Sequence, residues 1–225
     1  DKTPPELTYV NISSNNADTT WAKVDDSISI AFTSSEAISL SNYSINLDGV
    51  DDYIQLPENI VSSYTDFTFM CRFRTDNNNG WARLMDFGSG TGINMFLTTS
   101  YSGTNKPRFA IKKSGGGEQQ LTATTALDQG QWYNIAFTID NSTSTGKLYI
   151  DGELVAENNS MTNTPSDLGN TCCNYFGKSQ YNDPYFDGLL DNMSIWSSPL
   201  TQVQIQNLIN TNPIGNESNL EGFWD

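Results

Sequence analysis

The fold of this chain is decided most clearly by the stretch KLYIDGELV at residues 147–155. Two short apolar runs in this stretch flank the dipeptide Asp151-Gly152. The dipeptide is a strong hairpin signal, because a type I′ turn needs positive φ at both central positions. Upstream, every second position holds an apolar or aromatic residue: Tyr133, Ile135, Phe137 and Ile139. This period of two predicts antiparallel strands with one buried face.

The same alternation recurs outward from this stretch along most of the chain. It is found at residues 28–33, 44–47 and 52–56, and polar or glycine-rich turns separate the runs. Many short strands at this spacing are typical of a sandwich or barrel and not of βαβ units.

One helix is expected, over residues 201–210. Thr201 can cap its first turn and Gln204 can complete a capping box, while Ile205, Leu208 and Ile209 form a one-sided apolar stripe. The helix is expected to cover one end of the sandwich.

Composition narrows the function classes. Aromatic residues make up 12 % of the 225 residues, which is too many for a disordered chain. The net charge of −15 argues against a nucleic-acid surface and against docking on an anionic membrane. The chain has no histidine, which excludes Ser-His-Asp chemistry, Cys-His chemistry and His-ligated zinc. No stretch approaches the roughly 20 apolar residues of a membrane span.

Three cysteines give a weak redox signal. Cys71 lies in an alternating run with phenylalanines and is expected to be a buried, inert thiol. Cys172 and Cys173 are adjacent. They are compatible with a vicinal disulfide, a bond to a partner or no bond at all.

Five segments in a fixed order carry a resemblance to a known family. They are residues 43–54, 66–69, 131–137, 147–152 and 186–196, the last of them followed by the expected helix. Together they resemble the laminin-G-like, concanavalin A-like jelly-roll domains of bacterial surface proteins and carbohydrate-active enzymes. The resemblance implies an all-β fold, a sandwich of two antiparallel sheets with one short helix near the C-terminus.

The resemblance also suggests a division of the chain. Residues 1–39 resemble the first half of a bacterial immunoglobulin-like repeat, with two strands, and residues 40–213 form the jelly-roll domain. Residues 214–225 resemble the start of a further repeat. No signal peptide opens the sequence, so we expect a fragment of a larger secreted or cell-surface protein.

A calcium site is expected where the two ends of the jelly roll meet. Asp48, Asp51 and Asp52 cluster in the opening turn, and the first and last strands of a jelly roll commonly lie side by side, which would bring Asp187 and Asp191 close. Asp191 shares parity with apolar residues, so we expect it to point inward. Ca²⁺ takes six to eight oxygen ligands, and members of the family often carry a structural calcium. The alternative is that Asp187 and Asp191 only bond turn amides.

Aromatic residues outside the alternating runs are candidates for sugar stacking. A pyranose presents an apolar face to a ring, while Asn and Asp fix its hydroxyls. The expected ligand-binding residues are Trp81, Tyr101, Tyr181, Asn182, Asp183 and Tyr185. The alternative is that these rings cover sandwich edges.

Glycosidases on this fold use paired carboxylates, often as Glu-x-Asp-x-x-Glu, and this sequence has no such motif. We therefore expect a non-catalytic, extracellular module that binds a polysaccharide or glycoconjugate, in adhesion or in targeting the larger protein. We expect neither binding to nucleic acid nor insertion into a membrane. We do expect contacts with neighbouring domains of the parent chain. The alternative is a structural spacer or protein-binding module in a multidomain surface adhesin.

Overall fold

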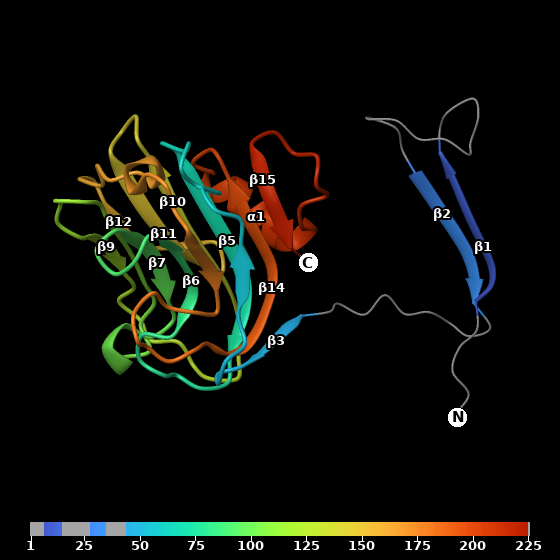
Figure 1. Cartoon of the computed structure of the whole chain (residues 1–225), viewed down its shortest axis with the longest axis horizontal. Coiled ribbons are helices and arrows are strands. Elements are labelled where there is room, and N and C mark those ends of the chain that lie inside the picture. The colour runs from blue at the N-terminus through green and yellow to red at the C-terminus, as the bar shows by residue number, and fades with distance from the viewer. Residues whose placement is uncertain (1–6, 15–27, 35–43, 225) are drawn as a thin grey trace. The chain divides into compact units, whose positions relative to one another are not determined.

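The computed structural model describes residues 7–14, 28–34 and 44–224, the first two ranges by their backbone alone. The chain divides into two units, Asp1–Asn42 and Tyr43–Asp225 (Figure 1). The first contains the antiparallel pair β1 (Leu7–Ser14) and β2 (Ile28–Ser34). These are the two strands expected in the lead-in. Among the described residues, no helix has the length and apolar character that a membrane span requires.

The second unit is a sandwich of two antiparallel sheets. The seven-stranded sheet has the order β12 (Glu153–Asn158), β11 (Thr145–Ile150), β10 (Trp132–Asp140), β5 (Phe67–Thr75), β14 (Asp187–Trp196) and β15 (Leu220–Trp224), and β3 (Ile45–Asp48) also pairs with β14. Figure 1 shows β10, β5 and β14 side by side.

The second sheet carries the pocket described below. Its order is β4 (Ile54–Leu56), β13 (Cys173–Phe176), β6 (Arg83–Gly88), β7 (Asn94–Thr98), β8 (Arg108–Lys112) and β9 (Gln119–Thr122). Two 3₁₀ turns flank its strands: Tyr101–Gly103 lies between β7 and β8 within this sheet, and Pro165–Leu168 lies between β12 of the other sheet and β13. The two-sheet sandwich expected from the sequence is therefore confirmed.

The core lies between the two sheets and is rich in phenylalanine. Phe109 of β8 stacks on Phe137 of β10 with ring centroids 3.9 Å apart, so this contact joins the sheets directly. Phe69 of β5 and Phe87 of β6 both pack on Phe176 of β13. All five rings are fully buried. Such burial is the main favourable term in folding.

The expected hairpin and helix are both present. Asp151 and Gly152 have φ values of 48° and 78° between β11 and β12, as a type I′ turn requires. The helix α1 spans Gln202–Thr211, with Thr201 as its N-cap and Gln204 completing the capping box. Its apolar side packs on a small cluster that includes Trp196 and is separate from the main core.

Both ends of the second unit pair with one strand. β3 pairs with residues 187–190 of β14, and β15 pairs with residues 193–196 of the same strand. Residues 214–225 were expected to open a further repeat. In the structure their strand β15 belongs to the seven-stranded sheet.

Candidate functional site

A pocket of about 230 Å³ opens on the face of the six-stranded sheet that is turned away from the core. Its lining residues are Trp81, Arg83, Phe96, Glu118, Tyr181 and Asp183. They come from the turn before β6 and its first residue, the middle of β7, the turn before β9 and the segment between β13 and β14. We call this last segment, residues 177–186, the covering loop.

Strand periodicity explains how β7 contributes to the pocket. Met95 and Leu97 point into the core, so Asn94, Phe96 and Thr98 share the opposite face. Phe96 is 4 % exposed because the covering loop and the start of β6 enclose this face.

Arg83 forms the floor of the pocket and is 2 % exposed. Its Nη1 donates to the backbone oxygen of Trp81 at 2.6 Å, its Nη2 to Asp183 Oδ2 at 2.9 Å and its Nε to Asp86 Oδ2 at 3.4 Å. Its guanidinium lies 4.0 Å from the ring centroid of Phe96. Burial lowers the pKa of Arg83, and the two carboxylates oppose that shift.

Asp86 anchors the covering loop to the sheet. Its Oδ1 accepts from Asn94 Nδ2 and Gln180 Nε2, both at 3.0 Å, and its Oδ2 accepts from the backbone N–H of Gln180 at 3.1 Å. Burial raises the pKa of Asp86, and Arg83 together with these donors opposes the rise. A fully buried carboxylate with this many partners is satisfied in place, as a buried charge must be.

The covering loop is also held by its own hydroxyls. Ser179 Oγ donates to Asp183 Oδ2 at 3.0 Å and accepts the backbone N–H of Tyr181 at 3.0 Å. The Tyr181 hydroxyl donates to the backbone oxygen of Thr91 at 2.5 Å, which holds a ring that is 40 % exposed. Tyr181 is therefore a positioned aromatic surface at the mouth of the pocket.

Trp81 forms an aromatic wall of the pocket. Its ring meets Tyr101 edge-on at 5.0 Å and Phe96 at 6.3 Å. Its backbone has φ of 71°, uncommon for a residue with a side chain, and its N–H donates to the backbone oxygen of Ser100 at 2.9 Å. The guanidinium of Arg108 lies over Tyr101, 3.2 Å from its centroid.

The pocket brings together three of the six expected ligand-binding residues: Trp81, Tyr181 and Asp183. Tyr101 supports Trp81 from behind. Asn182 is exposed in the covering loop and does not line the pocket. Tyr185 lies in a different aromatic group.

That second group, the tyrosine cluster, consists of Tyr53, Tyr175 and Tyr185 around one lysine. Tyr53 lies 5.5 Å from Tyr175 and 6.2 Å from Tyr185 between centroids. The ammonium of Lys178 sits 3.9 Å from the Tyr53 ring. Because a lysine of the same chain already occupies the space between the rings, the cluster is less open to a sugar than the pocket.

Two larger grooves lie against the seven-stranded sheet. One, of about 400 Å³, runs between β10–β12 and residues 199–202, and the other, of about 440 Å³, lies between α1 and residues 217–219, just before β15. The aromatic ring in each, Tyr149 and Trp196 respectively, is only 3 % exposed. Neither groove therefore presents a ring surface for stacking.

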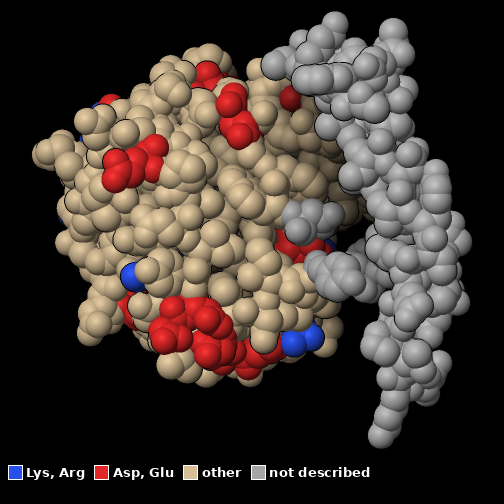
Figure 2. Space-filling view, turned by 45° about the vertical axis from the view of Figure 1, so that its right-hand side comes forward, with Lys and Arg blue, Asp and Glu red and all other residues tan. Residues whose placement is uncertain are grey.

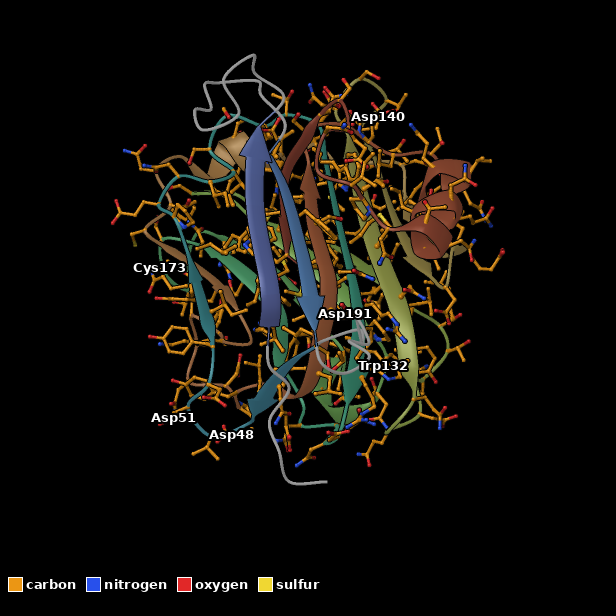
Figure 3. The ribbon with its side chains drawn as sticks, turned by 90° about the vertical axis from the view of Figure 1, so that its right-hand side faces the viewer. Asp48, Asp51, Trp132, Asp140, Cys173 and Asp191 are labelled. Atoms are coloured by element: carbon orange, nitrogen blue, oxygen red, sulfur yellow. The ribbon has the colours of Figure 1, made fainter. Side chains whose placement is uncertain are left out.

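The expected metal ligands separate into two places. Asp48, Asp51 and Asp52 are exposed, and one carboxylate oxygen of each lies within 4.8 Å of the others. Asp187 pairs with Asp48 across the strands and packs beneath Gly49, where an added Cβ would lie 2.7 Å from the Asp187 Cβ. Figure 2 shows acidic side chains gathered in patches on the face it presents, and Figure 3 shows Asp48 and Asp51 together at one end of the unit.

Asp191 lies elsewhere. It is buried, as expected, with 3 % exposure, but it lies beside Arg72 and not among the apolar core residues. A bulge between Asp191 and Ser194 shifts the register of β14 against β5, with Asn192 at φ of 50°. Asp191 therefore faces Arg72, whose Nη1 donates to its Oδ2 at 2.9 Å, and the guanidinium of Arg72 lies over the ring of Trp132. Figure 3 labels Asp191 and Trp132. A bulge of one residue reverses inward and outward positions, which single-strand parity cannot anticipate.

Sequence reasoning missed three pocket residues: Arg83, Phe96 and Glu118. Phe96 carried a usable signal, because it shares parity with the polar Asn94 and Thr98 while Met95 and Leu97 fill the other face. Arg83 carried none, because its contact with Asp183 joins segments one hundred positions apart, and Glu118 carried none, because it is an isolated exposed acid.

Comparisons with solved structures identify similar folds. Domain 4 of an extracellular GH43 arabinanase from Geobacillus stearothermophilus, in complex with arabinotriose, has a TM-score of 0.63 and 19 % identity, covering 88 % of this chain and 87 % of that one. The CBM40 of a Ruminococcus gnavus IT-sialidase, bound to α2,3 sialyllactose, has a TM-score of 0.60 and 16 % identity, covering 73 % and 95 %. A SAP-like pentraxin from Limulus polyphemus has a TM-score of 0.57 and 14 % identity, covering 82 % and 89 %.

Sequence comparison gives the family. Among curated proteins none matches this chain. A laminin-G family model, described as the concanavalin A-like lectin/glucanases superfamily, matches residues 48–206. The match spans most of the second unit and confirms the resemblance drawn from its five segments. The chain therefore belongs to the concanavalin A-like lectin/glucanases superfamily, as a laminin-G-like jelly-roll domain.

Proposed function

We propose that this chain is a non-catalytic glycan-binding module of a larger extracellular protein, and that the Trp81 pocket is its binding site. The observation that carries the proposal is that one pocket combines aromatic rings with carboxylates. The rings belong to Trp81 and Tyr181, and the carboxylates to Asp183 and Glu118. A ring can stack on the apolar face of a sugar while the carboxylates accept hydrogen bonds from its hydroxyls. The fold relatives that carry arabinotriose and sialyllactose support a sugar as the class of ligand.

The size of the pocket supports recognition of one sugar ring. Its volume of about 230 Å³ lies below the roughly 300–1,000 Å³ of pockets that enclose drug-sized ligands. A non-catalytic role agrees with the environment of its acids. Of the two carboxylates that line the pocket, Asp183 is tied to Arg83 and Ser179, so only Glu118 is free and the pocket offers no pair of free carboxylates for acid–base work.

A glycan array with two matched variants tests the proposal. Tyr181 and Tyr53 are each 40 % exposed, but only Tyr181 lines the pocket. Tyr181→Ala should weaken binding of any glycan hit about ten-fold, because a ring–sugar contact is lost, whereas Tyr53→Ala should leave it unchanged. Loss of binding in Tyr53→Ala alone would move the site to the tyrosine cluster.

A role as spacer or protein-binding module in a multidomain surface adhesin is the alternative. It predicts no glycan hit for the whole chain and a shared interface with flanking modules of the parent protein. If the folded protein bound neither neutral nor acidic polysaccharides, this alternative would be favoured.

A structural calcium ion is a separate proposal, at Asp48, Asp51 and Asp52. Hard carboxylate oxygens are the ligands that Ca²⁺ prefers, and the backbone carbonyls of a glycine-containing turn can add to them. Two of the carboxylates already accept backbone N–H groups, of Val50 at 2.9 Å and of Asp48 at 3.3 Å, which orders the turn. Calcium that binds only the folded state should raise the melting temperature relative to EDTA. An equal melting temperature in both, or an equal rise in Asp51→Asn, would remove the ion from this site.

A further inference from the structure

We propose that the Trp81 pocket binds uncharged sugars and rejects acidic ones such as sialic acids and uronates. The inference rests on the proposed function and adds a ligand class to it. It follows from which charged groups of the pocket are engaged and which remain available.

The positive charge of the pocket is engaged inside the protein. Arg83 is the only cation among the lining residues, and its side chain is 2 % exposed. Its Nε, Nη1 and Nη2 each donate to an acceptor of the chain: Asp86, the Trp81 backbone and Asp183. Three of the five N–H groups of Arg83 are thus engaged, and the side chain is almost fully buried, so Arg83 is poorly placed to offer a ligand carboxylate the bidentate contact that guanidinium groups make when they recognise acids.

The carboxylates are the charged groups that remain available. Glu118 is exposed at the rim and has no hydrogen-bond or ion-pair partner within the described part of the chain. Asp183 uses its Oδ2 for Arg83 and Ser179, and its side chain is 22 % exposed. Its Oδ1 makes no hydrogen bond with described residues. The pocket thus presents charged acceptors to its ligand.

Carboxylates that accept hydrogen bonds favour a ligand that carries hydrogen-bond donors. A sugar hydroxyl donates to a carboxylate, whereas an ionised carboxylate has only acceptors and repels it. Two like charges about 4 Å apart in water weaken binding roughly five-fold, and more strongly where the pocket excludes water. The neighbouring cations do not reverse this. Arg108 is stacked on Tyr101 with its Nε on Thr122 Oγ1, Lys178 is enclosed in the tyrosine cluster, and neither of them lines the pocket.

Matched neutral and acidic glycans test the inference. Suitable probes are lactose with sialyllactose, and oligogalactosides with oligogalacturonates, alongside arabinotriose, measured by titration calorimetry at low salt. The neutral member of any pair that binds should bind at least about five-fold more tightly than its acidic partner. Glu118→Gln should narrow that gap, because it removes the charge and keeps the shape. Glu157→Gln, an exposed change on β12 of the other sheet, should leave the gap unchanged.

The outcomes separate this inference from the proposed function. Tighter binding of the acidic member, abolished by Tyr181→Ala, would overturn the neutral-sugar inference and leave glycan binding at the pocket intact. A gap of the same size in Glu118→Gln and in the unmodified chain would also overturn it. Binding of no probe in either class would remove the glycan function, and the inference with it.

Discussion

Replacing Arg83 by methionine should destabilise the folded chain by about 3 kcal/mol at neutral pH. Arg83 and Asp86 are 2 % and 0 % exposed, and removing one partner of a buried ion pair typically costs about 3–5 kcal/mol. The lower end applies here, because Asp86 keeps its donors from Asn94 and Gln180, and methionine keeps part of the packing on Phe96.

The loss of stability in Arg83→Met should depend on pH, and the pKa shift of Asp86 determines whether the loss grows or shrinks in acid. Burial raises the pKa of Asp86, so the folded state holds this proton more tightly than the unfolded state does. A group of this kind stabilises the fold below its unfolded pKa, and the contribution is lost as pH rises through the folded pKa. Without Arg83 the folded pKa should rise further. The deficit of Arg83→Met relative to the unmodified chain should therefore shrink in mild acid.

Urea unfolding followed by tryptophan fluorescence, at neutral pH and in mild acid, measures both effects. The double variant Arg83→Met with Asp86→Asn should lose less than the sum of the single losses, because no ionised carboxylate is left without its partner. A deficit that is independent of pH, or that grows in acid, would refute the reasoning. So would strictly additive losses.

Three further predictions concern stability and thiol chemistry. Phe137→Ala should cost about 3–5 kcal/mol in urea unfolding, because it removes a fully buried ring that joins the two sheets, and a loss under 1 kcal/mol would contradict this. Thr201→Ala should cost about 1 kcal/mol, as loss of an N-cap does, whereas an unchanged midpoint would argue that the cap is dispensable. In the reduced, folded protein a thiol reagent should label Cys172 and Cys173 but not Cys71, whose pKa burial raises; early labelling of Cys71 on peptide mapping would refute its burial.

Local signals in the sequence were sufficient for much of the fold. The turn at Asp151-Gly152 and the helix cap at Thr201 each depend on residues within a few positions of one another, so both could be predicted. Strand alternation placed Cys71 and Phe137 in the core for the same reason. The family match adds the order of the segments, which no single segment contains.

The site was less predictable, because its contacts are long-range. Asp183 meets Arg83 across one hundred positions of sequence, and Gln180 meets Asp86 across 94. Trp81 and Tyr181 could be singled out as rings outside strand patterns, but nothing local indicated which rings would share a pocket. Asp191 is buried as expected, but a bulge that parity could not anticipate places it opposite Arg72 and not among the apolar core residues.

Because β3 and β15 pair with the same strand, β14, the chain of this module can be rearranged or inserted into another protein. β15 and β3 both run antiparallel to β14, with Trp224 opposite Met193 and Ile45 opposite Leu190. The two ends of the unit are thus separated by three residues of β14, or about 10 Å at the rise of an extended strand. A short linker from Trp224 to Ile45 would close the chain into a ring, and new ends could be opened in the glycine-rich turn at residues 114–117. For the same reason, the jelly roll can be inserted as a cassette into a surface loop of a host protein, because entry and exit need little more than the width of that loop.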